Sequence, residues 1–181
     1  MCIRDRLHTQ LFFLTVLVAA CAERRHQRAL TAAVRPDQAG DARPNLKADV
    51  IERAMAAYAG SCEIVFSDER AALLETGGGV KKALPLLGDA PFPVANGDVL
   101  WLEADHTNHA LTQMIQNFDP AKMDALLLLS DRARASGYDG QGDYMIDEDR
   151  RLTRRQDETG AHVFAGVQIL TPALFDATPN G

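Results

Sequence analysis

The sequence has 181 residues, of which 46% are apolar and 24% are charged, and it carries a formal net charge of −6. This length suits one domain with a single hydrophobic core, and the acidic balance argues against a nucleic-acid surface. The odd set of Cys2, Cys21 and Cys62 has no CxxC spacing, which argues against a disulfide framework and a zinc site and favours a reducing compartment.

The first residues of the chain resemble an export signal. Two arginines precede the apolar run Leu11–Ala20, and Cys21 follows small residues, as in lipidated bacterial proteins. The run is shorter than the roughly 20 apolar residues that a membrane-spanning helix needs. An exported lipoprotein therefore remains as one alternative, and it requires lipidation of Cys21.

A second interpretation of the same segment is an artefact. Met1–Arg6 matches the translation of a transposon adapter used in sequencing libraries, and residues 22–43 show no sustained helical or strand periodicity. We therefore expect residues 1–43 to be an artefactual or disordered segment that makes few packed contacts. The folded domain is expected over residues 44–181.

From Asn45 onward the hydrophobic pattern becomes regular. It predicts strands over residues 63–66, 91–95, 123–129, 143–146, 152–155 and 163–170. It predicts helices over residues 50–58, 80–87 and 107–118, and a short one that begins at Pro172. Strands that alternate with helices indicate an α/β fold with a mostly parallel, Rossmann-like sheet flanked by helices. The charged run of Arg150, Arg151, Arg154 and Arg155 is expected on an exposed strand.

The first chemical motif is Glu75-Thr-Gly-Gly-Gly79 at the entry to a helix. Glycines let the backbone turn sharply and approach a ligand closely, and a helix N-terminus offers N–H groups to an anion. The motif is neither a GxGxxG fingerprint nor a P-loop. Taken alone, it indicates a nucleotide contact about as well as a turn that caps a helix.

The second motif is Asn96-Gly97-Asp98, directly after an apolar strand. A carboxylate at the carboxyl end of a parallel strand lies where open α/β sheets bind ligands, and Mg²⁺ is held by one or two carboxylates with phosphate oxygens. A tight Asn-Gly turn with a solvated Asp98 explains the same residues. The motif alone leaves both interpretations open.

Together these motifs resemble a known family. The segments Leu74–Gly88, Pro91-Phe92, Asn96–Trp101, Gly137–Tyr144 and Phe164–Leu170 are similar to those of sugar-1-phosphate nucleotidyltransferases, above all the group that includes N-acetylmuramate-1-phosphate uridylyltransferases and proteins called mannose-1-phosphate guanylyltransferases. The resemblance is continuous over about residues 45–181. It implies a cytoplasmic enzyme with the nucleotide-diphospho-sugar transferase type of fold, with no nucleic-acid or membrane partner.

The resemblance also implies roles for individual residues. The main chain of Thr76, Gly77 and Gly78 would contact the base of the nucleotide, and Asn96 would also bind the nucleotide. Asp98 would be the catalytic residue and would hold Mg²⁺ between the triphosphate and the sugar phosphate. The sugar phosphate pocket would be lined by Gly142, Asp143, Phe164 and Gly166. The implied reaction is attack of a sugar 1-phosphate oxygen on the α-phosphorus of UTP or GTP, with release of pyrophosphate, where the sugar is N-acetylmuramate or mannose.

The sequence departs from the family pattern in two places. The family begins with a Gly-rich loop that carries Arg and Lys, which residues 1–44 do not match, and it has a second metal-binding Asp near a V-G-T-P segment that is not found before Gly181. We therefore expect an incomplete domain, and a chain that does not turn over substrate as written. The alternative from another class is a non-catalytic nucleotide-binding module.

Overall fold

The chain forms an α/β domain built on one mixed sheet. The computed structural model describes residues 16–21, 28–33, 48, 52–53, 55, 62–70, 74, 76–97, 99, 109–156 and 162–177. The strands are β1 (Val16–Cys21), β2 (Arg28–Ala33), β3 (Cys62–Ser67), β4 (Phe92–Asn96), β5 (Ala125–Asp131), β6 (Tyr144–Ile146), β7 (Leu152–Arg154) and β8 (His162–Leu170). The helices are α2 (Thr76–Leu87), α3 (Ala110–Asn117) and the 3₁₀ turns η1 (Arg132–Arg134) and η2 (Pro172–Phe175).

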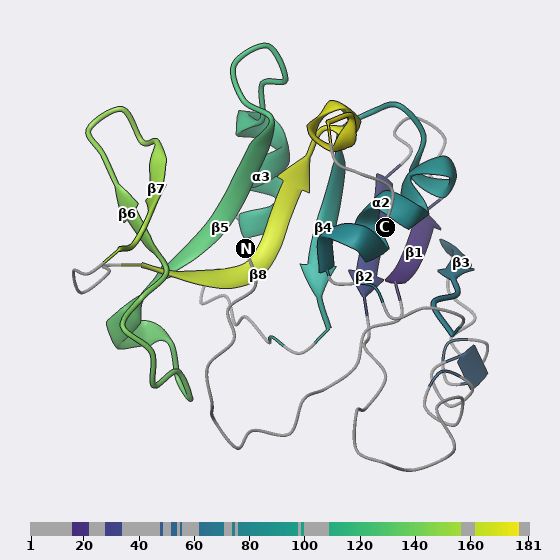
Figure 1. Cartoon of the computed structure of the whole chain (residues 1–181), viewed down its shortest axis with the longest axis horizontal. Helices are drawn as coiled ribbons and strands as arrows, with labels where there is room; N and C mark the ends of the chain where they lie inside the picture. Colours follow the sequence, from purple (N-terminus) through teal and green to yellow (C-terminus); the bar gives the residue numbers. More distant parts are fainter. Residues whose placement is uncertain are drawn as a thin grey trace.

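The strands form a single sheet whose order is β3-β1-β2-β4-β8-β6-β7, with β5 on the other side of β8 (Figure 1). Of the pairings between described strands, β2 with β4 is parallel and the others are antiparallel. The prediction of an α/β fold is confirmed, but the prediction of a mostly parallel sheet is wrong for these strands. Parallel neighbours need long crossover connections, whereas β6 and β7 are joined by a short hairpin and β8 returns antiparallel to β4 and β5.

Two strands lie in the segment that we expected to stay outside the sheet. β1 pairs with β2 and β3, and β2 pairs with β4 from Thr31 to Ala33. The expectation of few contacts for residues 1–43 is therefore wrong for β1 and β2. A strand such as β4 exposes a row of main-chain donors and acceptors, and β2 pairs with that row. The domain boundary at residue 44 and the artefactual origin of the preceding segment stay predictions.

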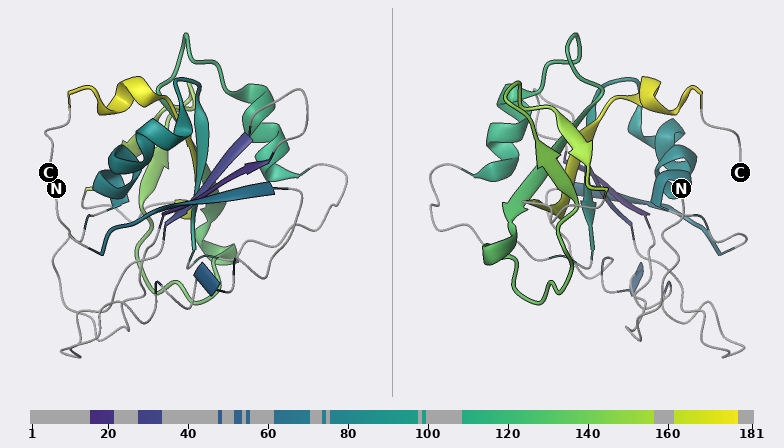
Figure 2. Two further views of the ribbon diagram at one scale, coloured as in Figure 1. Left: turned by 90° about the vertical axis from the view of Figure 1, so that its right-hand side faces the viewer. Right: turned by 60° about the vertical axis from the view of Figure 1, so that its left-hand side comes forward.

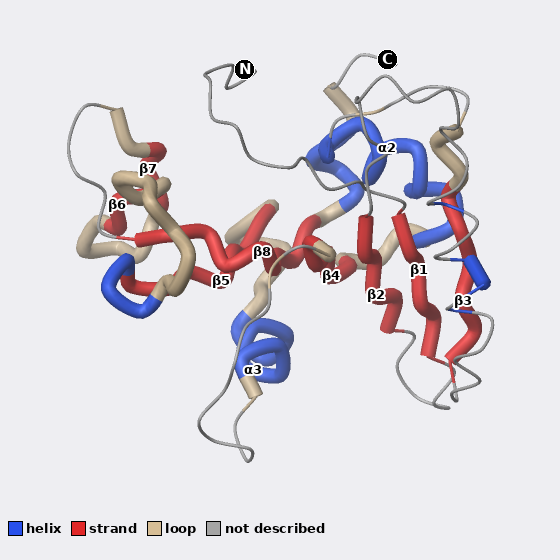
Figure 3. Tube along the Cα trace, turned by 90° about the horizontal axis from the view of Figure 1, so that it is seen from below, coloured by secondary structure: helices blue, strands red, loops and turns tan. Residues whose placement is uncertain are grey.

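Helices cover both faces of the sheet. α2 lies on one face and α3 on the opposite face, which is clearest when the sheet is seen edge-on (Figures 2 and 3). No helix within the described part of the chain has the length and apolarity needed to cross a membrane. The arrangement leaves the strands β4 and β8 at the centre of the domain, between the two helical layers.

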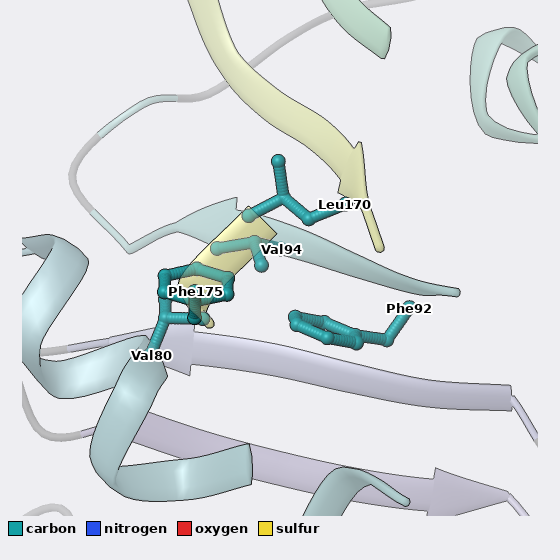
Figure 4. Packing of buried hydrophobic residues seen from close by; sticks show 5 residues of the cluster. All are labelled: Val80, Phe92, Val94, Leu170 and Phe175. Atoms are coloured by element: carbon teal, nitrogen blue, oxygen red, sulfur yellow. The ribbon is translucent and has the colours of Figure 1, made fainter. Parts of the chain in front are cut away.

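Each face of β4 and β8 has its own hydrophobic core, because side chains alternate along a strand. The cluster on the α2 face consists of Val80, Phe92, Val94, Leu170 and Phe175 (Figure 4). The cluster on the α3 face consists of Ala95, Met114, Val167 and Ile169. Two layers of buried apolar side chains therefore hold β4 against β8 from both sides.

The Phe92 side chain gives a direct test of this core. It is 2% exposed, so Phe92→Ala should lower the free energy of unfolding by about 3–5 kcal/mol through lost burial and a cavity. Leu86→Ala is the control on the same face of the sheet, because Leu86 is 47% exposed and its truncation should change stability by less than about 0.5 kcal/mol. Chemical denaturation of the two variants beside the wild type measures both values. Equal losses would show that Phe92 is not a core residue.

Candidate functional site

The glycine motif forms the first turn of α2. The helix begins at Thr76, four residues earlier than predicted, so Gly77 and Gly78 are helical rather than part of a preceding loop. The first four N–H groups of any helix lack partners within the helix and carry partial positive charge. A Cβ atom on Gly78 would lie 3.2 Å from Cβ of Leu74, whereas a Cβ on Gly77 would meet nothing within 4 Å. The start of α2 can therefore approach a ligand closely at Gly77.

The second motif lies at the end of β4. Asn96 is the last residue of the strand and is half-buried, and Gly97 is exposed in the following turn. The short turn at residues 88–91 joins α2 to β4, so the two elements run in opposite directions and the start of α2 lies at the same end of the sheet as Asn96 (Figure 1). Asp98 lies outside the described residues. Its role stays a prediction.

The end of β4 lies against a distorted part of β8. Ala95 is opposite Val167, and β8 changes register against β5 between its contacts with Leu127 and Leu129. Such a bulge adds residues to one strand and bends it. Gly166 is the residue that takes up the bend, because its φ of +73° lies in the left-handed region that favours glycine.

Gly166 also allows a close contact between the two predicted sides of the site. A Cβ atom on Gly166 would lie 3.0 Å from Cβ and Cγ2 of Val99 and 3.2 Å from Cβ of Asn96. Both distances are tighter than ordinary van der Waals contact. The structure therefore brings together Gly166, predicted on the sugar side, and Asn96, predicted on the nucleotide side.

A hydrogen-bond network joins the other predicted sugar-side residues. Asp143 precedes β6, and its carboxylate accepts hydrogen bonds from the main-chain N–H of Phe164 at 2.9 Å and from the Tyr138 hydroxyl at 3.2 Å. The N–H of Gly142 donates to the Tyr138 hydroxyl oxygen at 3.1 Å. The structure therefore places Gly142 and Asp143 against the middle of β8, two residues from Gly166.

Two residues of this network were not predicted from the sequence. Tyr138 is half-buried, and burial together with the nearby Asp143 carboxylate raises the pKa of its hydroxyl above the usual value of 10.0. Arg155 was expected on an exposed strand, but it is half-buried and its Nε donates to the carbonyl oxygen of Gly142 at 2.8 Å. The only available signal was the presence of Tyr138 inside the Gly-rich segment. Nothing local marks Arg155 apart from its neighbouring arginines.

The described residues do not form a metal centre by themselves. Among them, no group of three His, Cys, Asp or Glu side chains lies close enough together to hold a metal ion. His162 lies 3.5 Å from the Asp131 carboxylate, which is an ion pair across β8 and β5 when the imidazole is protonated.

Comparison with known proteins finds two enzymes to which this chain is similar in sequence. The chain is 39% identical over 139 residues to the N-acetylmuramate alpha-1-phosphate uridylyltransferase of Caulobacter vibrioides, a match that covers 74% of this chain and 56% of that protein. It is 36% identical over 118 residues to the N-acetylmuramate alpha-1-phosphate uridylyltransferase of Neisseria meningitidis serogroup B, covering 65% of this chain and 48% of that protein. The chain thus spans about half the length of these relatives. No protein-family model matches it.

The close approach at Gly166 gives a prediction that separates backbone strain from crowding. Gly166→Ala should lower the free energy of unfolding by about 2–4 kcal/mol, because the new methyl group adds a clash with Val99 and Asn96 to the strain of a positive φ. Gly137→Ala is the matched control: its φ is +78° but a Cβ there meets nothing within 4 Å, so about 1–2 kcal/mol of strain is expected. Thermal or chemical unfolding compares them. Equal losses would mean that β8 does not pack tightly on the end of β4.

Proposed function

This chain belongs to the sugar-1-phosphate nucleotidyltransferase family, and from that premise we propose that it carries substrate-binding parts of an enzyme that transfers the uridylyl group of UTP to N-acetylmuramate 1-phosphate. An oxygen of the sugar phosphate attacks the α-phosphorus of UTP, the bond from that phosphorus to the bridging oxygen breaks, and pyrophosphate leaves. The observation that carries the proposal is the junction at Gly166, where β8 meets the end of β4. It puts Asn96, assigned to the nucleotide, against Gly166, assigned to the sugar phosphate.

The nucleotide side of the proposed site is the start of α2 with the end of β4. Thr76, Gly77 and Gly78 hold the base through main-chain groups, which a side chain at Gly77 would obstruct. Asn96 lies at the same end of the sheet, so a nucleotide bound there reaches from α2 towards β8. The N-terminal turn of α2 also favours negative charge on a bound ligand.

The sugar-phosphate side is the bulged part of β8 with the turn that packs on it. Phe164 and Gly166 lie on β8, and Gly142 and Asp143 lie on the adjoining turn, where Asp143 binds the Phe164 N–H. Positioning two substrates for in-line attack supplies much of the catalysis in such reactions. A site built on β-strands is suited to that task because strands hold their residues in fixed register.

The proposed cofactor is Mg²⁺, held by Asp98. The donor set fits this ion in one respect: Mg²⁺ is usually bound by one or two carboxylates together with substrate phosphates, rather than by a cage of protein ligands. The ion would neutralise charge on the triphosphate and on the sugar phosphate. We place the reaction in the cytoplasm, where nucleoside triphosphates are available, and we propose that the domain has the nucleotide-diphospho-sugar transferase type of fold.

Substrate binding and turnover test the proposal directly. Calorimetry with the chain and Mg²⁺ should show binding of UTP and of N-acetylmuramate 1-phosphate, each at least about tenfold tighter than GTP and mannose 1-phosphate respectively. Pyrophosphate release from the preferred pair measures turnover, which we do not expect from the chain as written. Binding of UTP with no binding of either sugar phosphate would support a nucleotide-binding module instead. Tighter binding of GTP and mannose 1-phosphate would replace the proposed substrates.

The Asp98 assignment has its own test, which does not depend on turnover. Asp98→Asn should remove most of the Mg²⁺ dependence of UTP binding, a loss of about tenfold or more in affinity at saturating Mg²⁺, because a neutral amide is a poorer ligand for a hard cation. In any form that turns over, the same change should lower kcat by about two orders of magnitude. Asp89→Asn is the control, because Asp89 is an exposed carboxylate in the turn after α2. Unchanged Mg²⁺ dependence in Asp98→Asn would exclude the assigned role.

A further inference from the structure

The Tyr138–Asp143 loop is fixed to β8 by a single aspartate. The main-chain N–H of Asp143 donates to the carbonyl oxygen of His162 at 2.7 Å, and its carbonyl oxygen accepts from the N–H of Arg155 at 3.0 Å. Its carboxylate binds the Tyr138 hydroxyl and the Phe164 N–H. Each polar group of Asp143 is therefore engaged within the protein, which suits a residue that holds other residues in place.

The bond to Phe164 lies at a particular point of β8. β6 pairs with β8 at His162, and β4 pairs with β8 from Val167 to Leu170. Phe164 lies between these two pairings, where neither β4 nor β6 continues the ladder. The Asp143 carboxylate supplies the acceptor for the Phe164 N–H at this point, two residues before the positive φ of Gly166.

The Tyr138 hydroxyl determines where that carboxylate lies. It donates to Oδ1 of Asp143 and accepts from the N–H of Gly142, so it bridges two consecutive residues of the turn. A tyrosine hydroxyl is protonated at neutral pH, so it can donate to the carboxylate. The loop folds back far enough for these bonds because residue 140 is glycine: a Cβ there would lie 2.5 Å from Cζ and from the hydroxyl oxygen of Tyr138.

We infer that Tyr138 is a positioning residue for the sugar-phosphate side of the site: its hydroxyl bridges Gly142 and Asp143, and through the Asp143 carboxylate it fixes the Phe164–Gly166 stretch of β8. This inference rests on the proposed function. Tyr138 itself does not touch substrate. Removal of the Tyr138 hydroxyl shifts the Phe164–Gly166 stretch of β8 next to the sugar phosphate. It leaves the start of α2, where the nucleotide binds, unchanged.

Tyr138→Phe tests the inference, with calorimetry for binding and amide exchange by NMR for the network. The affinity for N-acetylmuramate 1-phosphate should fall about tenfold, because the Phe164–Gly166 stretch is no longer held in its binding position, while the affinity for UTP stays the same. The Phe164 amide should exchange faster, and the amides of Val94 and Gln168, where β4 holds β8, should keep their rates. Tyr144→Phe is the matched control, since the network does not use the Tyr144 hydroxyl.

Gly140→Ala is a second, independent variant. This variant keeps the tyrosine but displaces its ring and hydroxyl. The new methyl group meets only the far end of the Tyr138 side chain, so the chain should still fold. It should reproduce both effects of Tyr138→Phe. Asp143→Asn, which keeps one carbonyl oxygen, should restore part of the Phe164 protection that Asp143→Ala loses.

The outcomes separate the inference from the proposed function. Equal sugar-phosphate affinity in wild type and Tyr138→Phe, or an equal loss of UTP affinity, would overturn the positioning role alone. An unchanged Phe164 exchange rate would do the same. A wild-type chain that binds no sugar phosphate would overturn the proposed function, and the positioning role with it, whatever the exchange rates show.

Discussion

Strand β8 pairs with three other strands, and the arrangement of the rest of the domain depends on these pairings. It pairs with β5 along most of its length, with β6 at His162 and with β4 beyond Val167. A strand cannot keep one flat register against partners that differ in direction and twist, so β8 bends at a bulge. Gly166 accepts the positive φ of that bend, and the bend brings the strand against Asn96 and Val99. The two proposed substrate sides meet there.

The sequence predicted the elements with strong local signals. The apolar runs of β4, β5 and β8 were found within two residues of their ends, because burial on both faces requires continuous apolar sequence. α3 was found from its periodicity, and α2 was found except for its glycine turn. The direction of strand pairing was not predictable, since it depends on connections and distant partners rather than on any local pattern. β1 and β2 were missed for the same reason: their place in the sheet is set by pairing with β3 and β4.

In the candidate site, too, the sequence indicated some residues and missed others. Resemblance picked out Gly142, Asp143, Phe164 and Gly166, and the structure gathers all of them around the middle of β8. The resemblance could not indicate that the Asp143 carboxylate accepts a hydrogen bond from the main-chain N–H of Phe164, because Phe164 is 21 residues away along the chain. Tyr138 and Arg155 were missed because their hydrogen bonds form only when the loop folds onto β8. Sequence patterns mark residue types that chemistry needs, whereas supporting contacts belong to the folded chain.

The contact of Gly166 on β8 with Asn96 on β4 has a mechanical consequence. Phe164 and Gly166 are separated by roughly 7 Å or less along β8, the rise of two extended residues. β8 is held along one edge by β5, and along the other edge by β4 at one end and by Asp143 between β4 and β6. A shift of the Tyr138–Asp143 loop therefore acts first on the short stretch Phe164–Gly166, because β4 holds the rest of β8 from Val167 to Leu170. In the proposed function this stretch positions the sugar phosphate, and Gly166 is its residue that lies against Asn96.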